Sequence, residues 1–282
     1  MRSRSLVRIA ASPALAALLA LGIAAPAFCA PTLGTAAFAE AQIRMEQGIK
    51  MSLPRSIAPR PVFLRSGVCG RARFIDTATC NGAILRAINR ARRTEPLAVL
   101  PAGFDLAAFD KLDGAEQMFA IADIERTARG LPAMAGMTAQ LDAMAMASAI
   151  DQIDPLVDLP LHLRAGGTAT TYGSNFAEGT ANALGADYFW MYDDGPHSPN
   201  PGCTKSKQTM CWAHRKNTLD DYSSPAYCPP GSPVHLLMGA AVVTSGVMFS
   251  PAVTEIFVND CGKLPTHLIF TWSDVERLIL GR

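Results

Sequence analysis

The chain has 282 residues, with 25 Lys and Arg against 24 Asp and Glu, a formal net charge of +1, and 49% hydrophobic residues. A net charge this close to zero creates no whole-protein field that would attract a nucleic acid, so nucleic-acid binding is not expected. The length suits one substantial domain with a large core. Beyond its first residues the sequence has no long apolar segment, so no transmembrane anchor is predicted.

Residues 1–27 look like a secretory signal peptide. Three arginines within the first eight residues form a basic region, residues 13–25 are rich in Leu and Ala, and a small-x-small pattern ends at Ala27. We expect cleavage after Ala27 and a secreted or otherwise extracytoplasmic product, whose balance is then 22 basic against 24 acidic residues because three of the 25 basic residues leave with the leader. Cys29 suggests a lipoprotein, but Phe28 stands where lipoprotein processing requires a small residue.

Cysteine usage agrees with export, because disulfides persist in oxidising compartments. Nearest-neighbour pairing of the six cysteines after Cys29 predicts three bridges, although sequence alone permits many other connectivities. The spacings do not repeat as those of structural zinc sites do, and the sequence has no CxxC pair. The nearest-neighbour pairs are Cys69–Cys80, Cys203–Cys211 and Cys228–Cys261.

In chain order, residues 28–80 are predicted to form an N-terminal extension or linker, with one helix-compatible stretch at 40–50, and residues 81–282 the main domain. A helix is predicted over 81–93, where Ile84, Leu85 and Ile88 follow helical spacing. Its opposite face carries an arginine stripe, which we interpret as a solvated face in preference to a site for an anionic partner. The stripe consists of Arg86, Arg90 and Arg93.

Three more helices follow. One is predicted over 114–129, because Gly130 with Pro132 beyond it is a normal helix stop. A second, over 138–150, is rich in Ala and Met and is expected to be a buried packing helix, with Met144 and Met146 as core filler. The third covers residues 180–192 and directs Leu184, Tyr188 and Trp190 inward.

The C-terminal part of the chain favours strands. Residues 234–243 and 253–258 are rich in β-branched and other apolar residues and are separated by turn residues, so they are predicted to pair antiparallel. Residues 269–272 add a strand before a short tail helix. Helices followed by paired strands indicate a layered α/β architecture.

Several short motifs occur in one order and at one spacing. The segment 203–219 reads CTKSKQTMCWAHRKNTL, with a close cysteine pair just before a histidine. Together the motifs resemble the CAP superfamily, which contains the cysteine-rich secretory proteins, antigen 5 proteins and plant pathogenesis-related proteins (SCP-like domains). The resemblance covers residues 110–262 and implies an αβα sandwich with antiparallel strands and packed helices. The other motifs are Glu125-Arg126, Gly130-Leu131-Pro132, the Gly173-Ser174-Asn175 turn, and Trp190 with Asp193 three residues later.

In that family a cleft contains two His and two Glu residues that can hold a divalent cation. The resemblance places His214 at the second His and Asp193 at the second Glu. Ser174 stands where the family has a glutamate, and Ala169 where it has the first His; the nearest histidine, His162, has no motif to place it. We therefore expect no cofactor, and zinc is the ion that His214 and Asp193 would hold if the cleft held one.

The sequence predicts a secreted CAP-like protein with a degenerate cleft that binds a lipid, a glycan or a protein partner and does not catalyse a reaction. The alternative is an exported metal-dependent or serine hydrolase that uses His214, Asp193 and Ser174. A third hypothesis is a structural envelope protein stabilised by its disulfides. The expected cleft residues are His214, Asp193, Ser174, Asn175 and Trp190, whereas His197, His235 and His267 are expected to be structural.

Overall fold

The structure is a computed structural model that describes residues 52–282 apart from 54, 59–60, 66, 71–73, 96, 101–102, 165, 205–209, 221–227, 234 and 263–266. The chain divides at residues 35 and 36, and every described residue belongs to the second part. The predicted signal peptide, Cys29 and the helix-compatible stretch at 40–50 lie outside the described residues. None of the helices in the described part is both long and apolar enough to cross a membrane.

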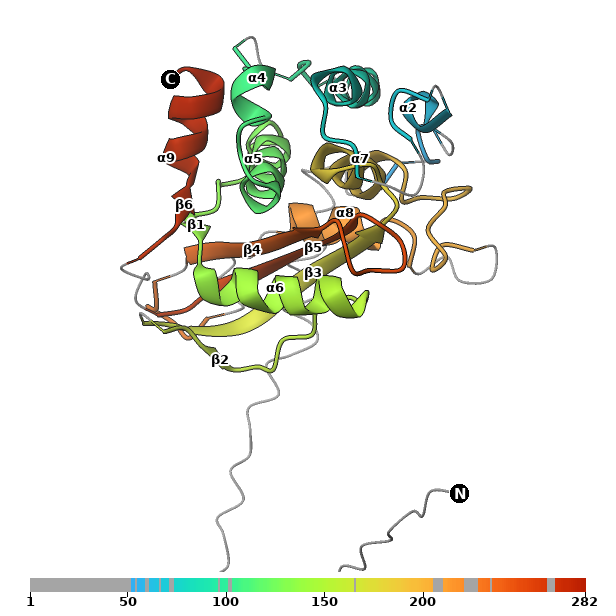
Figure 1. Ribbon diagram of the computed structural model, residues 1–282. Coiled ribbons are helices and arrows are strands. Elements are labelled where there is room, and N and C mark those ends of the chain that lie inside the picture. Colours follow the sequence, from blue (N-terminus) through green and yellow to red (C-terminus); the bar gives the residue numbers. More distant parts are fainter. Residues whose placement is uncertain are drawn as a thin grey trace, which may run out of the picture. The chain divides into compact units, whose positions relative to one another are not determined.

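The described part of the chain begins with four helices, and strands and helices then follow in mixed order (Figure 1). In chain order they are α2 (Val62–Arg65), α3 (Ala78–Arg92), α4 (Leu106–Phe109), α5 (Gly114–Thr127), β1 (Gly136–Met137), α6 (Ala139–Asp151), β2 (Leu161–His162), β3 (Thr168–Glu178), α7 (Ala183–Tyr192), α8 (Ala213–Leu219), β4 (His235–Val243), β5 (Ala252–Asp260), β6 (Phe270–Thr271), α9 (Trp272–Val275) and the π-helical turn η2 (Glu276–Leu280). The predicted helices and the predicted pair of long strands are therefore present.

The strands form one mixed six-stranded sheet in the order β2-β3-β5-β4-β1-β6. β5 pairs antiparallel with both β3 and β4, as expected for β4 and β5. The prediction of antiparallel strands is wrong for one pair, because β1 runs parallel to β4. The parallel pairing is possible because more than 90 residues connect the two strands, well above the dozen or so that a crossover needs.

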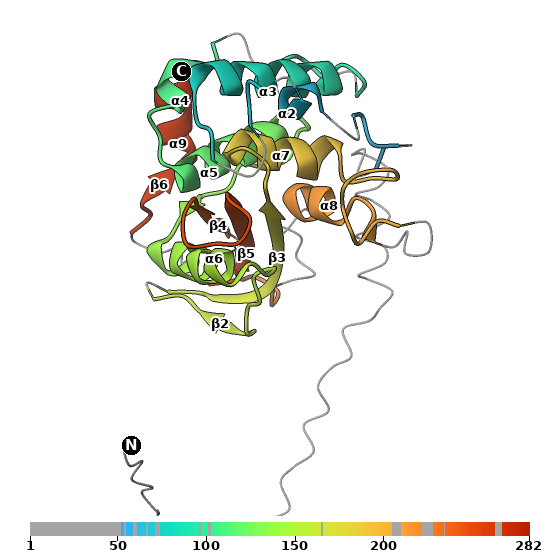
Figure 2. The same ribbon diagram turned by 45° about the vertical axis from the view of Figure 1, so that its right-hand side comes forward.

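Helices cover both faces of this sheet, with α6 on one side and α5 and α7 on the other (Figures 1 and 2). The alternation of side chains along β4 explains the two layers, because successive residues of a strand point to opposite faces. Met238 and Ala240 belong to the core that contains α5 and α7. Leu237 and Ala241 belong to a second core, which Leu141 of α6 also enters. The fold is thus a mixed α/β arrangement with the sheet between helices.

α6 approaches the sheet closely because β4 has a glycine at the crossing point. A Cβ atom on Gly239 would lie 2.3 Å from the carbonyl carbon of Leu141, so no side chain fits there. α6 buries only one stripe of side chains, and Met146 is 43% exposed. The expectation that α6 is a buried helix with Met146 as core filler is therefore wrong, because α6 lies on the outer side of the sheet.

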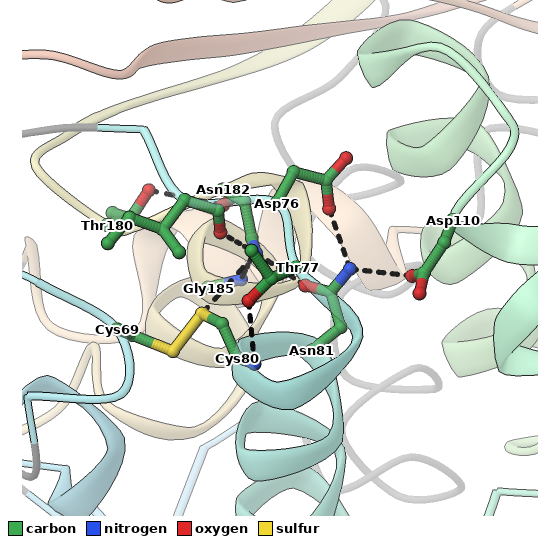
Figure 3. The surroundings of a disulfide bond; sticks show 10 residues. Cys69, Asp76, Thr77, Cys80, Asn81, Asp110, Thr180, Asn182 and Gly185 are labelled. Atoms are coloured by element: carbon green, nitrogen blue, oxygen red, sulfur yellow. Dashed lines mark hydrogen bonds between the residues drawn. A yellow bond between two sulfur atoms is a disulfide. The ribbon is translucent and has the colours of Figure 1, made fainter.

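The described residues that precede α3 pack into the core that contains α5 and α7. Figure 3 shows the disulfide between Cys69 and Cys80, which fixes the loop after α2 to the first turn of α3. Beside it, Asn182 caps α7 and donates from Nδ2 to Oδ1 of Asn81 at 2.5 Å. Asn81 in turn donates to Asp110 at 2.7 Å. Part of the predicted extension therefore helps to fix the position of α7.

The sequence analysis missed β3 and α8. It described Gly173-Ser174-Asn175 as a turn, and this is wrong, because these residues lie in the middle of β3 and pair with β5. Gly and Asn have low strand propensity, but a central neighbouring strand overrides local preference. The structure also has the three nearest-neighbour disulfides Cys69–Cys80, Cys203–Cys211 and Cys228–Cys261.

Candidate functional site

A cavity of about 450 Å³ lies where the end of α7 and the start of α8 meet the last residues of β3. This volume falls in the range of small-molecule sites. Of the expected cleft residues, His214, Asp193 and Trp190 line the cavity, whereas Ser174 and Asn175 do not. Its remaining lining comprises Leu64, Phe176, Ala177, Glu178, Gly179, Thr180, Phe189, Asp194, Pro199, Asn200 and Pro201. We call this cavity the His214 pocket.

Asp194 holds His214 in place by two hydrogen bonds. The Nδ1 atom of His214 lies 2.8 Å from Oδ1 of Asp194, and the backbone N–H of His214 donates to Oδ2 of Asp194 at 3.0 Å. Burial opposes the charged imidazole, but the hydrogen bond and the charge of Asp194 outweigh it, so the pKa of His214 is raised. The Nε2 atom has no hydrogen-bond partner among the described residues, and the ring keeps 22% of its surface exposed.

The backbone before α8 brings His214 to this position. The disulfide Cys203–Cys211 closes the loop between α7 and α8. Trp212 then adopts φ +66°, and its N–H donates to the carbonyl of Asp194 at 3.0 Å. The ring of Trp212 covers Gly195, where a Cβ atom would lie 2.1 Å from it. Because Trp212 supplies no side-chain cap, Asp194 takes the role of capping the first turn of α8.

Asp193 is the second acid of the His214 pocket, and its environment differs from that of Asp194. Asp193 is 1% exposed. The hydroxyl of Ser56 lies near its carboxyl group, and the two carboxyl oxygens have no other hydrogen-bond partner among the described residues. Burial raises the pKa of Asp193 to about 8; Ser56 opposes this shift, and the negative charge of Asp194 adds to it. At pH 7 Asp193 is therefore mainly the neutral acid, which can donate as well as accept a hydrogen bond.

Trp190 forms the wall behind the histidine. Its ring stacks on that of His214, with 6.4 Å between centroids and 29° between planes. Its Nε1–H donates to the carbonyl of Phe176 at 3.4 Å, which attaches the end of α7 to β3. Trp190 is 3% exposed, so it holds the imidazole ring and offers little surface to a ligand.

Asn175 does not line the pocket, but its side chain connects α8 to the sheet. It donates to Oε1 of Glu255 at 2.6 Å and to the backbone carbonyl of His214 at 3.1 Å. Thr218 of α8 donates to the same Glu255 oxygen at 3.1 Å. Burial raises the pKa of Glu255 to about 8, and the hydrogen bonds of Asn175 and Thr218 oppose that shift. Asn175 and Glu255 thus fix α8, and with it His214, to the sheet.

Ser174 is not part of the His214 pocket. Its hydroxyl donates to the carbonyl of Pro155 at 2.9 Å, and no contact between Ser174 Oγ and the His214 ring occurs in the described part of the chain. Ser174 precedes Asn175 in β3, so its side chain points to the other face of the sheet. A hydroxyl nucleophile must lie within hydrogen-bond reach of its base, and Ser174 does not meet that condition.

The residues of the pocket do not fit the zinc ion that the family resemblance suggests. A catalytic zinc takes three protein ligands. Asp194 occupies Nδ1 of His214, Ser174 points away, and Ala169 stands where a second histidine would be needed. Within the described residues, no three His, Cys, Asp or Glu side chains come together as they would around a metal ion.

The remaining histidines lie elsewhere. His162 is in β2, where its ring contacts the hydroxyl of Thr168 at 3.2 Å. His235 begins β4 and lies 3.8 Å from Asp260. His197 lies in the loop after α7 with φ +71°.

Sequence reasoning missed Asp194, Asn200 and Glu255. Asn200 donates to Oδ1 of Asp194 at 2.6 Å and so completes the support of His214. The sequence signal was the acid pair Asp193-Asp194 at the predicted helix end, which offers two neighbouring carboxyls for one histidine. The spacing to Trp190 pointed to Asp193, but the structure pairs His214 with Asp194.

No protein-family model, curated protein or solved structure matches this chain.

Proposed function

We propose that this chain is a secreted CAP-like domain that binds a hydroxyl-rich ligand of the glycan class in the His214 pocket and does not turn it over. The sheet between helices, with β5 antiparallel to both β3 and β4, supports the CAP-like part of the proposal. The three disulfides support secretion, because such bonds persist in oxidising compartments.

The separation of Ser174 from His214 carries the choice of binding over catalysis. An acyl-transfer enzyme of the serine type needs a nucleophile, a base and an orienting acid in contact. Here the base and the orienting acid, His214 and Asp194, are in contact at 2.8 Å, but the hydroxyl of Ser174 bonds to Pro155 instead. The pair can therefore orient a ligand through Nε2 of His214, and Ser174 is not placed to attack that ligand.

The polar groups of the pocket favour a glycan over a lipid or a protein partner. Neutral Asp193 can donate and accept, and the imidazole of His214 adds a further hydrogen-bonding atom. Ligand hydroxyls have the same dual capacity, so each can pair with such groups. A few polar groups in an otherwise apolar concave site fix the orientation of a small ligand. Leu64 and Phe189 supply apolar surface.

Thermal unfolding with added oligosaccharide tests this proposal. A ligand that binds only the native state raises the midpoint of unfolding by mass action. With N-acetylglucosamine oligomers as the probe, we expect a rise in the wild type that is lost in His214→Gln and in Asp193→Leu, which removes both the donor and the acceptor of Asp193. The matched control is His267→Gln, which changes an exposed histidine outside the pocket and should keep the rise.

Three results would contradict the proposal, the last of them only in its ligand class. Hydrolysis of a simple ester by the wild type that disappears in both His214→Gln and Ser174→Ala would favour the hydrolase. A zinc-dependent rise in the unfolding midpoint that His214→Gln removes would favour a metal site. A rise with phospholipid or sterol but none with the oligosaccharide would replace the ligand class and leave the site in place.

A further inference from the structure

A second cavity lies between α2, α3 and α7 and shares no lining residue with the His214 pocket. Its volume is about 300 Å³, at the small end of ligand sites. The disulfide Cys69–Cys80 joins the loop after α2 to α3, so two of its walls are covalently fixed. Its apolar lining consists of Ile57, Ala58, Pro61, Val62, Phe63, Val68, Ala83 and Ala87.

Two arginines of α3 line the same cavity. Arg86 and Arg90 are four residues apart, so they lie on one face of the helix. Both are exposed, and neither has an ion-pair partner among the described residues. The third member of the arginine stripe, Arg93, does not line the cavity. An apolar cavity with two unpaired cations at its edge is complementary to a ligand with an apolar body and an anionic end.

Tyr188 provides a third polar group in the cavity. The residue is 1% exposed, and its hydroxyl has no hydrogen-bond partner in the described part of the chain. Because the hydroxyl oxygen is not sealed from the cavity, it can donate to a ligand oxygen there. Burial and the charge of Asp193 raise the pKa of Tyr188, and the nearby charge of Arg90 opposes that rise. Tyr188 and Arg90 both line the cavity, so its polar groups come from α3 and α7.

We propose that this cavity binds a small anionic amphiphile of the medium-chain fatty acid type. The carboxylate binds Arg86 and Arg90 at the edge, with the hydroxyl of Tyr188 as a further donor, and the alkyl chain packs against Phe63, Val68 and Ala87. Charge decides the class of ligand, because a neutral amphiphile leaves both arginines unpaired. This site is independent of the glycan site in the His214 pocket.

Calorimetric titration of the purified protein with decanoate, below its micelle-forming concentration, tests the proposal. We expect saturable binding of one decanoate per chain and binding of decanol that is about tenfold weaker, a difference of about 1.4 kcal/mol. Acetate, which keeps the charge and lacks the chain, should not bind measurably. Added salt should weaken decanoate binding, because the arginines are exposed to solvent.

Variants then locate the site. The double variant Arg86→Gln/Arg90→Gln should bind decanoate about tenfold more weakly, whereas Arg93→Gln, an exposed arginine at the end of the same helix, should bind as the wild type does. Ala87→Leu fills the cavity and should abolish binding. Unfolding midpoints of all variants check that each one folds.

Four results would overturn the proposal. The first is decanol binding as tightly as decanoate; the second is a double variant indistinguishable from Arg93→Gln; the third is unchanged binding in folded Ala87→Leu. Loss of decanoate binding in His214→Gln, with binding kept in the double arginine variant, would place the ligand in the His214 pocket and would also overturn it.

Discussion

Glu125 of α5 and Glu255 of β5 are both 0% exposed, yet the structure treats their charges in opposite ways. Oε2 of Glu125 accepts from Arg92 at 2.7 Å, from Arg129 and from the hydroxyl of Tyr192 at 2.9 Å. Glu255 meets only the amide of Asn175 and the hydroxyl of Thr218, and its Oε2 has no partner among the described residues. Equal burial thus accompanies a paired charge in one region and an unpaired acid in the other.

The partners of the two acids determine the direction in which each pKa is shifted. Burial alone would raise the pKa of Glu125, but Arg129 and Arg92 outweigh it and the pKa is lowered. For Glu255, burial dominates and raises the pKa to about 8. Neutral hydrogen-bond donors therefore do not offset desolvation, whereas two guanidinium groups do.

The two acids also give stability opposite dependences on pH. An acid with a lowered folded pKa stabilises above its unfolded pKa, and this stabilisation is lost as pH falls through the folded value. Glu125 follows this rule, so protonation of Glu125 at low pH lowers the stability of the fold. An acid with a raised folded pKa binds its proton better in the folded state, so stability falls as pH rises from about 4.5 to about 8. Glu255 therefore weakens the fold on the alkaline side.

The largest effect should come from breaking the paired region with Glu125→Gln. The substitution leaves Arg92 and Arg129 buried without their shared anion, and breaking a buried pair in this way costs about 3–5 kcal/mol. Denaturant unfolding with the disulfides intact measures the loss. The control is Glu178→Gln, an exposed glutamate at the end of β3, which should change stability by about 0.5 kcal/mol or less. Equal midpoints for the two variants would contradict a stabilising role for the arginine pairs.

The unpaired region should respond to Glu255→Gln in a pH-dependent way. Glutamine resembles the protonated acid, so near pH 5 the variant should unfold within about 1 kcal/mol of the wild type. As pH rises to 8, the wild type should lose up to about 1.4 kcal/mol per pH unit through this one group, and the variant should not. Unfolding midpoints at several pH values measure the difference in slope.

Residual slope in Glu255→Gln is expected, because burial also raises the pKa of Asp123 to about 7 and that of Asp193 to about 8. Glu178→Gln should keep the full slope of the wild type. Parallel stability profiles for Glu255→Gln and Glu178→Gln would show that Glu255 is ionised in the folded protein at pH 7.

The sequence predicted the elements whose apolar pattern is strong and local. The helix at 114–129 has a clear stop at Gly130 and Pro132, and the strand at 234–243 is an almost continuous apolar run. α5 and β4 lie there. β3 was missed because Gly173 and Asn175 lack strand propensity and owe their conformation to pairing with β5. Information of that kind lies in contacts between distant residues, which a local pattern does not contain.

The site was predictable only in part, for the same reason. His214 and Asp193 were found from their spacing to other motifs, and both line the pocket. The choice of Asp194 as the partner of His214 depends on the backbone turn at Trp212 and on Asn200, neither of which has a sequence pattern. The side of the sheet to which Ser174 points follows from strand register, which was unknown while β3 was unrecognised.

The smallest effect comes from two tyrosines four residues apart in α7, one with a hydrogen-bonded hydroxyl and one without. The hydroxyl of Tyr192 donates to Glu125 at 2.9 Å and accepts from Arg129 at 3.2 Å, so Tyr192→Phe should destabilise by about 1–2 kcal/mol. It should also raise the pKa of Glu125, because that hydrogen bond favours the charged carboxylate.

Tyr188→Phe is the matched change, because the hydroxyl of Tyr188 has no partner among the described residues. We expect little change in stability, because the substitution removes no hydrogen bond within the described part of the chain. Unfolding measurements at pH 7 on both variants decide the matter. Equal losses of stability in the two variants would mean that the hydrogen bonds of the Tyr192 hydroxyl do not stabilise the fold. A loss confined to Tyr192→Phe would show that these hydrogen bonds, and not burial of the ring, stabilise the fold.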